Sequence, residues 1–134
     1  MDNQLNNVLE KVKSASGFED AKFTDINELN LLNENALHYV ATWGDVEAAK
    51  TLIKAGININ QKGDEGYTPL HEAILQGNND LAIYLINNGA KTEIKNNDGL
   101  TPLELAIQEQ NKLVTKAIKQ HNKSFKPTPK SGAV

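Results

Sequence analysis

Apolar residues recur along the chain with the spacing of amphipathic helices. Leu70, Ala73 and Ile74 occupy positions i, i+3 and i+4, so they share one face of a helix. A second apolar face of the same spacing begins at Leu81, and Gly77 separates the two. The pattern predicts two short helices joined by a tight glycine turn.

The same unit occurs three times, at a shift of 33 residues and without insertions. One helix pair with its extended turn cannot bury its apolar face alone, so we expect stacking of the units to form the core. The three copies are NENALHYVATWGDVEAAKTLIKAGI (33–57), GYTPLHEAILQGNNDLAIYLINNGA (66–90) and GLTPLELAIQEQNKLVTKAIKQHNK (99–123).

A short motif marks the start of each helix pair. The second unit has Thr-Pro-Leu-His at 68–71 and the third has Thr-Pro-Leu at 101–103, in register with the other markers. This arrangement resembles the ankyrin repeat, and the resemblance covers about residues 23–122. It implies an all-α fold: an ankyrin-repeat solenoid of helix-turn-helix units with β-turn fingers and capping helices.

Residues at the unit boundaries support the same fold on physical grounds. Thr68 and Thr101 can cap the following helix, and the proline after each stands at the first helical position, where no N–H is needed. Gly66 and Gly99 follow acidic residues, and such pairs favour tight turns with positive φ.

Two units depart from the pattern. The first has Asn35-Ala36 in place of Thr-Pro, although the Leu-His that follows is kept. The third has Glu104 in place of the histidine and Gln110 in place of the linking glycine.

The ends of the chain read as caps around the repeats. At the N-terminus, Leu5, Val8, Leu9 and Val12 form one face of a helix that can cover the open end of the stack. We expect residues 1–30 to be an N-terminal helical cap (a degenerate repeat), 31–63 and 64–96 to be ankyrin repeats, 97–122 to be a C-terminal capping repeat, and 123–134 to be a flexible tail.

Composition excludes several classes of function. The chain has no cysteine, which rules out disulfides and thiolate metal sites. It has neither a secretory signal nor an apolar run that could span a bilayer, so we expect a cytoplasmic protein that does not act at membranes. Residues 1–122 hold 11 lysines against 17 acids and no arginine, a balance that disfavours nucleic acid as a partner.

The histidines are the first candidates for chemistry. His38 and His71 occupy the same place in successive repeats. The family resemblance implies that they hydrogen-bond the helix cap and the neighbouring turns; the alternative is a ligand or a general base. No third ligand and no catalytic motif accompanies them, so we expect no enzyme activity, no metal and no cofactor.

Apolar residues where the repeat leads us to expect polar surface point to a binding face. Partners of ankyrin stacks usually meet the turn tips and the inner helices, which together form a concave face. Trp43 falls there with Tyr39 and Tyr67, and aromatic side chains dominate interface energetics. The alternative is that Trp43 packs on the N-terminal cap beside Leu31 and Leu32. The expected protein-binding residues are Leu31, Leu32, Glu34, Tyr39, Thr42, Trp43, Asp64, Glu65, Tyr67, Leu75, Gln76, Asp98, Leu100 and Glu109.

The leading hypothesis is a non-catalytic protein-binding module, monomeric when free. Acids at the turn tips and at Glu109 favour a basic protein partner through electrostatic steering. The stretch 35–73 is similar to small standalone bacterial ankyrin proteins, some of which are immunity proteins, so a toxin domain is a candidate partner. The alternative is a scaffold or regulatory adaptor, or a fragment of a host-directed effector. An enzyme would need an enclosed substrate pocket, which three repeats rarely form.

Overall fold

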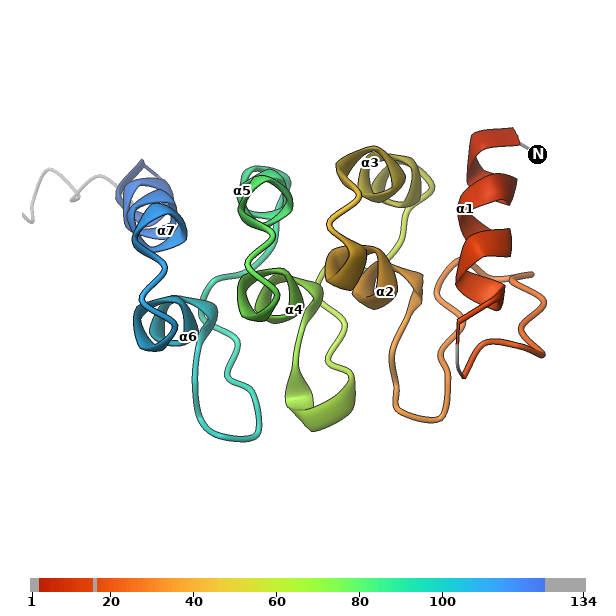
Figure 1. The fold of residues 1–134 in the computed structure, drawn as a ribbon, viewed down its shortest axis with the longest axis horizontal. Helices are drawn as coiled ribbons and strands as arrows, with labels where there is room; N and C mark the ends of the chain where they lie inside the picture. Colours follow the sequence, from red (N-terminus) through yellow and green to blue (C-terminus); the bar gives the residue numbers. More distant parts are fainter. Residues whose placement is uncertain (1–2, 16, 125–134) are drawn as a thin grey trace, which may run out of the picture.

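The computed structural model describes residues 3–15 and 17–124. Within them the chain forms seven α-helices, one 3₁₀ turn and no β-strand, which confirms the all-α class (Figure 1). The helices are α1 (Asn3–Lys13), α2 (Ala36–Trp43), α3 (Val46–Lys54), α4 (Pro69–Leu75), α5 (Asn79–Asn87), α6 (Pro102–Gln108) and α7 (Lys112–Ser124), and the 3₁₀ turn is η1 (Asp64–Gly66).

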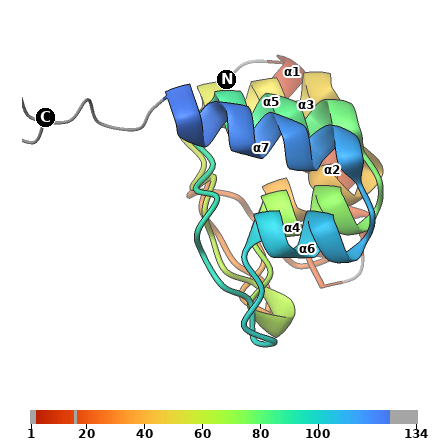
Figure 2. The same ribbon diagram turned by 90° about the vertical axis from the view of Figure 1, so that its left-hand side faces the viewer.

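The helices form two layers. The inner layer holds α2, α4 and α6, with α4 packed between the other two, and the outer layer holds α3, α5 and α7. Three fingers (30–34, 63–67 and 96–100) project from the inner layer, and Figure 2 shows that helices and fingers form an L in cross-section. We call the surface inside the L, formed by the fingers and the inner helices, the concave face.

Each finger is closed by the same backbone hydrogen bond. The N–H of the first finger residue donates to the carbonyl of the fifth, with N···O distances of 3.0, 2.8 and 2.9 Å in the three fingers. The second finger also contacts the third, because the Asn97 N–H donates to the Glu65 carbonyl over 2.9 Å. Gly66 has a φ of 73°, and a Cβ there would lie 2.6 Å from the Asn97 side-chain oxygen, so the position requires glycine.

The inner helices begin as the sequence predicts. The hydroxyls of Thr68 and Thr101 accept hydrogen bonds from backbone N–H groups of the first turn, and Pro69 and Pro102 occupy the first helical position. Asn35 performs the same capping in the divergent first repeat. Helix α2 therefore starts in the same way as α4 and α6, although Asn35-Ala36 replaces Thr-Pro.

The N-terminal cap contains a single helix among its described residues. Figure 1 shows α1 turned away from the direction shared by the other helices, and it packs mainly on α3 and also on α2. Leu9 and Val12 on its apolar face are buried, as are Phe18 and Phe23 in the loop that follows. The predicted apolar face of the cap helix is thus the one that covers the stack.

Asparagines continue the 33-residue register into the cap. The Asn27 side-chain oxygen accepts a hydrogen bond from the Asn58 N–H at 2.6 Å. One repeat later, the Asn60 side-chain oxygen accepts one from the Lys91 N–H at 2.8 Å. The cap is therefore joined to the first repeat in the same way as the first is joined to the second.

The C-terminal repeat differs in two respects. Gln110 adopts a φ of 57° where the other two repeats have glycine in the link between their helices. Helix α7 continues to Ser124, so the first two residues of the expected tail, Lys123 and Ser124, are helical. The rest of the expected tail, residues 125–134, lies outside the described residues. No helix in the described part of the chain has the length and apolar character to cross a membrane.

Candidate functional site

The two repeat histidines are structural. The Nδ1 atoms of His38 and His71 accept hydrogen bonds from the backbone N–H of Asn35 and Thr68, each at 3.1 Å. Their Nε2–H groups donate to carbonyl oxygens of the next finger, at 2.9 Å for His38 and 3.0 Å for His71. The implied role in caps and neighbouring turns is therefore confirmed.

Burial favours the neutral form of both rings. It lowers the pKa of His38 and of His71 below 6.5, although the backbone hydrogen bonds act in the opposite direction. In the third repeat Glu104 replaces the histidine, and its carboxylate accepts a hydrogen bond from the Thr101 N–H at 2.9 Å. This bond lowers the pKa of Glu104. Every ring nitrogen of the two histidines has a backbone partner, so neither is free to act as a base.

Acidic side chains gather on the concave face around Tyr67. Burial raises the pKa of the Tyr67 hydroxyl, and carboxylates from the second finger, the third finger, α4 and the end of α6 raise it further. Carboxylates from four separate elements are therefore neighbours in space. We call the following group the acidic patch: Glu34, Asp64, Glu65, Glu72, Asp98 and Glu109.

Glu72 on α4 is the member of this patch that the sequence analysis missed. Burial raises its pKa to about 7, and the carboxylates of Glu34 and Asp64 act in the same direction. The residue is half-buried, whereas Asp64 is exposed. Its position directly after the repeat histidine, on an inner helix, was the available signal. The patch thus contains a carboxylate for which a cationic neighbour would lower the energy of the charged form.

Trp43 lies at the edge of the concave face that adjoins the N-terminal cap. Its ring packs edge-on against Tyr39 at a centroid distance of 6.3 Å, and Tyr39 in turn packs edge-on against Phe18 at 5.4 Å. The Lys11 ammonium of α1 lies 4.4 Å from the Trp43 ring centre, a cation–π distance. Trp43 therefore contacts the cap and keeps part of its surface exposed.

The three aromatic side chains of the expected binding face do not form an exposed cluster. Tyr39, Trp43 and Tyr67 are all half-buried. Tyr39 and Trp43 belong to the aromatic row of the cap, whereas the Tyr67 ring lies 5.4 Å from that of His71. The reason is that α1 and its loop bring Phe18 and Lys11 to α2, which the repeat pattern does not specify.

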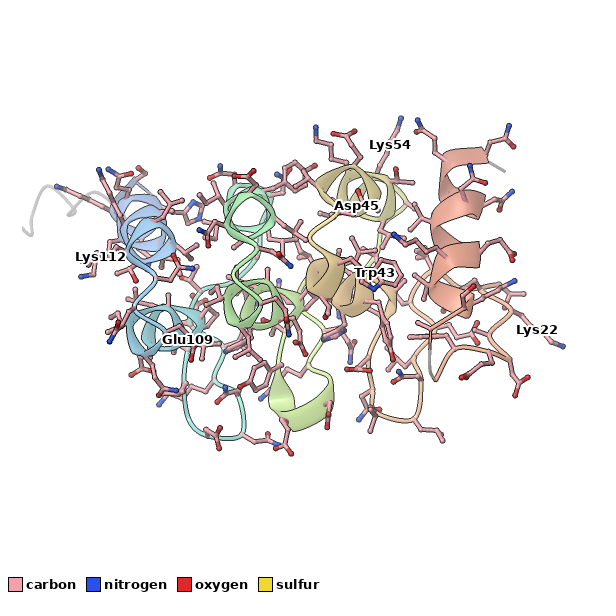
Figure 3. All side chains as sticks on the ribbon, viewed as in Figure 1. Lys22, Trp43, Asp45, Lys54, Glu109 and Lys112 are labelled. Atoms are coloured by element: carbon pink, nitrogen blue, oxygen red, sulfur yellow. The ribbon has the colours of Figure 1, made fainter. Side chains whose placement is uncertain are left out.

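The remaining expected residues fall into exposed and half-buried groups. Leu31 at the tip of the first finger is fully exposed, and Leu32 and Leu75 are also exposed. Leu100 is half-buried, and its carbonyl accepts the His71 bond. The polar members Thr42, Gln76, Asp98 and Glu109 are exposed, and Figure 3 shows Trp43 and Glu109 at the ends of α2 and α6.

The chemistry available at this face is electrostatic and apolar contact. Within residues 3–15 and 17–124, no three His, Asp or Glu side chains converge in a way that could hold a metal ion. The acidic patch spreads across the three fingers and the inner helices. Such a surface suits lysine or arginine side chains presented by a folded partner.

Comparison with known proteins gives one positive result. A family model described as ankyrin repeats (3 copies) matches residues 4–96 and again residues 61–129. The two matches together extend over most of the chain. No curated protein matches it.

Proposed function

Because the chain belongs to the ankyrin-repeat family, whose members are in general non-catalytic protein-binding modules, we propose that it binds a basic protein through its concave face. The three fingers and the inner helices would all contact the partner. The free chain is a monomer in this proposal. No step of covalent chemistry is required of any residue.

The observation that carries this proposal is the acidic patch, which includes the half-buried Glu72. Burial and two neighbouring carboxylates raise the pKa of Glu72 to about 7, so its charged form is disfavoured in the free protein. A lysine or arginine of the partner placed between Glu72, Glu34 and Asp64 would relieve this repulsion. Binding would then lower the pKa of Glu72 and release water from the patch.

An apolar edge beside the patch supports the same face. Leu31 and Leu32 project from the first finger, and the partly exposed ring of Trp43 lies at the end of α2. Apolar anchors next to a charged rim are the usual composition of a specific interface. In this proposal the acids steer the partner and the apolar edge supplies most of the affinity.

The biological role that we favour is that of a bacterial, cytoplasmic immunity protein, which neutralises a basic toxin domain by covering it. The second candidate is a scaffold or regulatory adaptor, or part of a host-directed effector. Gene neighbourhood distinguishes them, because an immunity gene is expected to follow directly the gene of its toxin.

Capture of partners from the native organism tests the proposal. The wild-type chain and a variant with Asp64→Lys and Glu65→Lys are used side by side as bait. We expect a basic protein to co-purify with the wild type and to be lost from the variant. A partner retained equally by both baits would show that the acidic patch is not the binding face.

A further inference from the structure

A second candidate surface lies at the end of the stack, on the outer side of α6 and α7. It is a groove of about 660 Å³, lined among others by Ile107, Thr115 and four lysines of α7. The side chain of Ile107 is 53% exposed there, although it is apolar. Figure 3 shows Lys112 at this end, opposite Lys22 at the cap. We call this surface the end face.

The repeat pattern indicates what the end face is shaped to receive. One repeat earlier, the equivalent surface of α4 and α5 is covered by α6 and α7. The end face is therefore the same kind of surface, on which a helix can pack. Three positions that are apolar in the second repeat hold lysine in the third. The apolar residues are Ile83, Ile86 and Ala90, and the lysines at the equivalent positions are Lys116, Lys119 and Lys123.

The charged side chains that α7 contributes to the end face are all positive. Lys112, Lys116, Lys119 and Lys123 follow one another at i, i+4, i+7 and i+11, which places all four on one side of α7. Helix α7 contains no acidic residue. The ion pairs formed among the described residues are Lys13–Glu10 and Lys50–Glu47, so neither involves these lysines.

Uncompensated lysines at this spacing destabilise the helix that carries them. Like charges at i and i+4 repel, and Lys112 also stands at the positive end of the helix dipole. A negatively charged neighbour would reverse both effects. The lysine stems and Ile107 meanwhile supply an apolar floor beneath the ammonium groups.

We propose that the end face binds an acidic amphipathic helix of a partner protein. Its apolar residues contact Ile107 and the lysine stems, and its carboxylates pair with the four ammonium groups. A further neutral repeat fits poorly, because it would leave the lysines desolvated and unpaired. This surface is separate from the acidic patch, so the proposal does not depend on the function proposed above.

Peptide titrations of the full-length, ¹⁵N-labelled chain test this proposal. The probes are a synthetic amphipathic helix with Glu and Leu spaced to match the lysines and Ile107, and a matched peptide with Gln in place of Glu. We expect the acidic peptide alone to shift the amide signals of α6 and α7. Binding should weaken at least about tenfold when the ionic strength rises from about 0.05 to about 0.5 M.

Charge-reversed variants locate the binding. Lys116→Glu with Lys119→Glu should weaken binding of the acidic peptide at least about tenfold and create binding of a matched lysine peptide. If that pair fails to fold, Lys116→Gln with Lys119→Gln replaces it, with the same expected loss. The control, Lys22→Glu with Lys54→Glu, makes the same change of charge away from the end face and should bind as the wild type does (Figure 3).

Any of the following results would overturn the proposal. The first is shifts outside α6 and α7, or an equal loss in the control variant. The second is tighter binding of a single-stranded RNA to the same amides than of the peptide. The third is concentration-dependent sedimentation that Lys116→Glu with Lys119→Glu abolishes, because a second copy of the chain would then be the occupant. The fourth is peptide binding that appears only with Phe125→Ala, because the chain's own residues after Ser124 would then occupy the groove.

Discussion

The Nε2–H group of His71 donates a hydrogen bond to the carbonyl oxygen of Leu100, 3.0 Å away, and joins the inner helix of the second repeat to the third finger. His38 makes the equivalent bond to Tyr67 at 2.9 Å. In the third repeat, which no finger follows among the described residues, glutamate replaces histidine and caps its own helix. Histidine thus occupies this position in the two repeats that are followed by a finger, and it hydrogen-bonds that finger.

Replacing His71 with alanine should destabilise the protein by about 2–3 kcal/mol. The change leaves the buried Thr68 N–H without its acceptor and the Leu100 carbonyl without its donor. Urea unfolding followed by circular dichroism measures the loss. Gln108→Ala, at an exposed position of α6, is the control and should cost less than about 0.5 kcal/mol. A similarly small loss for His71→Ala would contradict the role assigned to this ring.

Replacing Glu72 with glutamine should stabilise the protein at alkaline pH and not at acid pH. The folded-state pKa of Glu72 is about 7, above the ordinary value of 4.5 for a glutamate, so its contribution to stability is present below pH 4.5 and lost as the pH rises through 7. Glutamine removes the alkaline penalty. We expect a gain of about 1 kcal/mol near pH 8, discounted because the group is partly solvated, and little change near pH 5.

Urea midpoints of the wild type and Glu72→Gln at the two pH values provide this test. The other titrating groups, including the two buried histidines, are common to both chains and cancel in the difference. A difference that does not depend on pH would show that Glu72 is ionised as an ordinary surface carboxylate.

Gln110→Gly should stabilise the third repeat by about 0.5–1 kcal/mol. Gln110 adopts a φ of 57°, a left-handed conformation that glycine adopts without strain. The reciprocal change is Gly77→Gln in the second repeat, where φ is 73° and a Cβ would meet no atom within 4 Å, so only the backbone term is changed. It should cost about 1 kcal/mol. Equal stabilities for wild type and both variants in thermal unfolding would refute this account of the link.

Trp43→Ala should affect both stability and binding. The ring is half-buried against Tyr39 and Lys11, so truncation should cost about 1–2 kcal/mol of unfolding free energy, below the roughly 3–5 kcal/mol of a core aromatic. Its exposed part should contribute about 2 kcal/mol to partner affinity. A melting curve and a titration measure the two effects. A loss of stability at the core level with unaltered affinity per folded molecule would remove Trp43 from the binding face.

The repeat pattern specifies more of the fold than of the site. Thr68 and Pro69 fix a helix start by local chemistry, and that expectation was confirmed in detail. The surroundings of Trp43 depend on how α1 lies across α2 and α3, and no periodicity encodes that orientation. Glu72 was missed for a related reason, because its neighbours Glu34 and Asp64 belong to two different fingers. Local sequence signals predict where helices and turns lie, whereas the acidic patch forms only when the repeats stack.

The most direct test of the acidic concave face is calorimetric titration of the co-purified partner with three chains. They are the wild type, Asp64→Lys with Glu65→Lys, and the control Asp80→Lys with Glu93→Lys, which reverses the same charge at exposed positions outside the patch. The account predicts that the first pair weakens binding at least about tenfold at low salt, with a smaller difference at high salt, and that the control binds as the wild type does. Equal affinities for all three chains, or an equal loss in both variants, would contradict it.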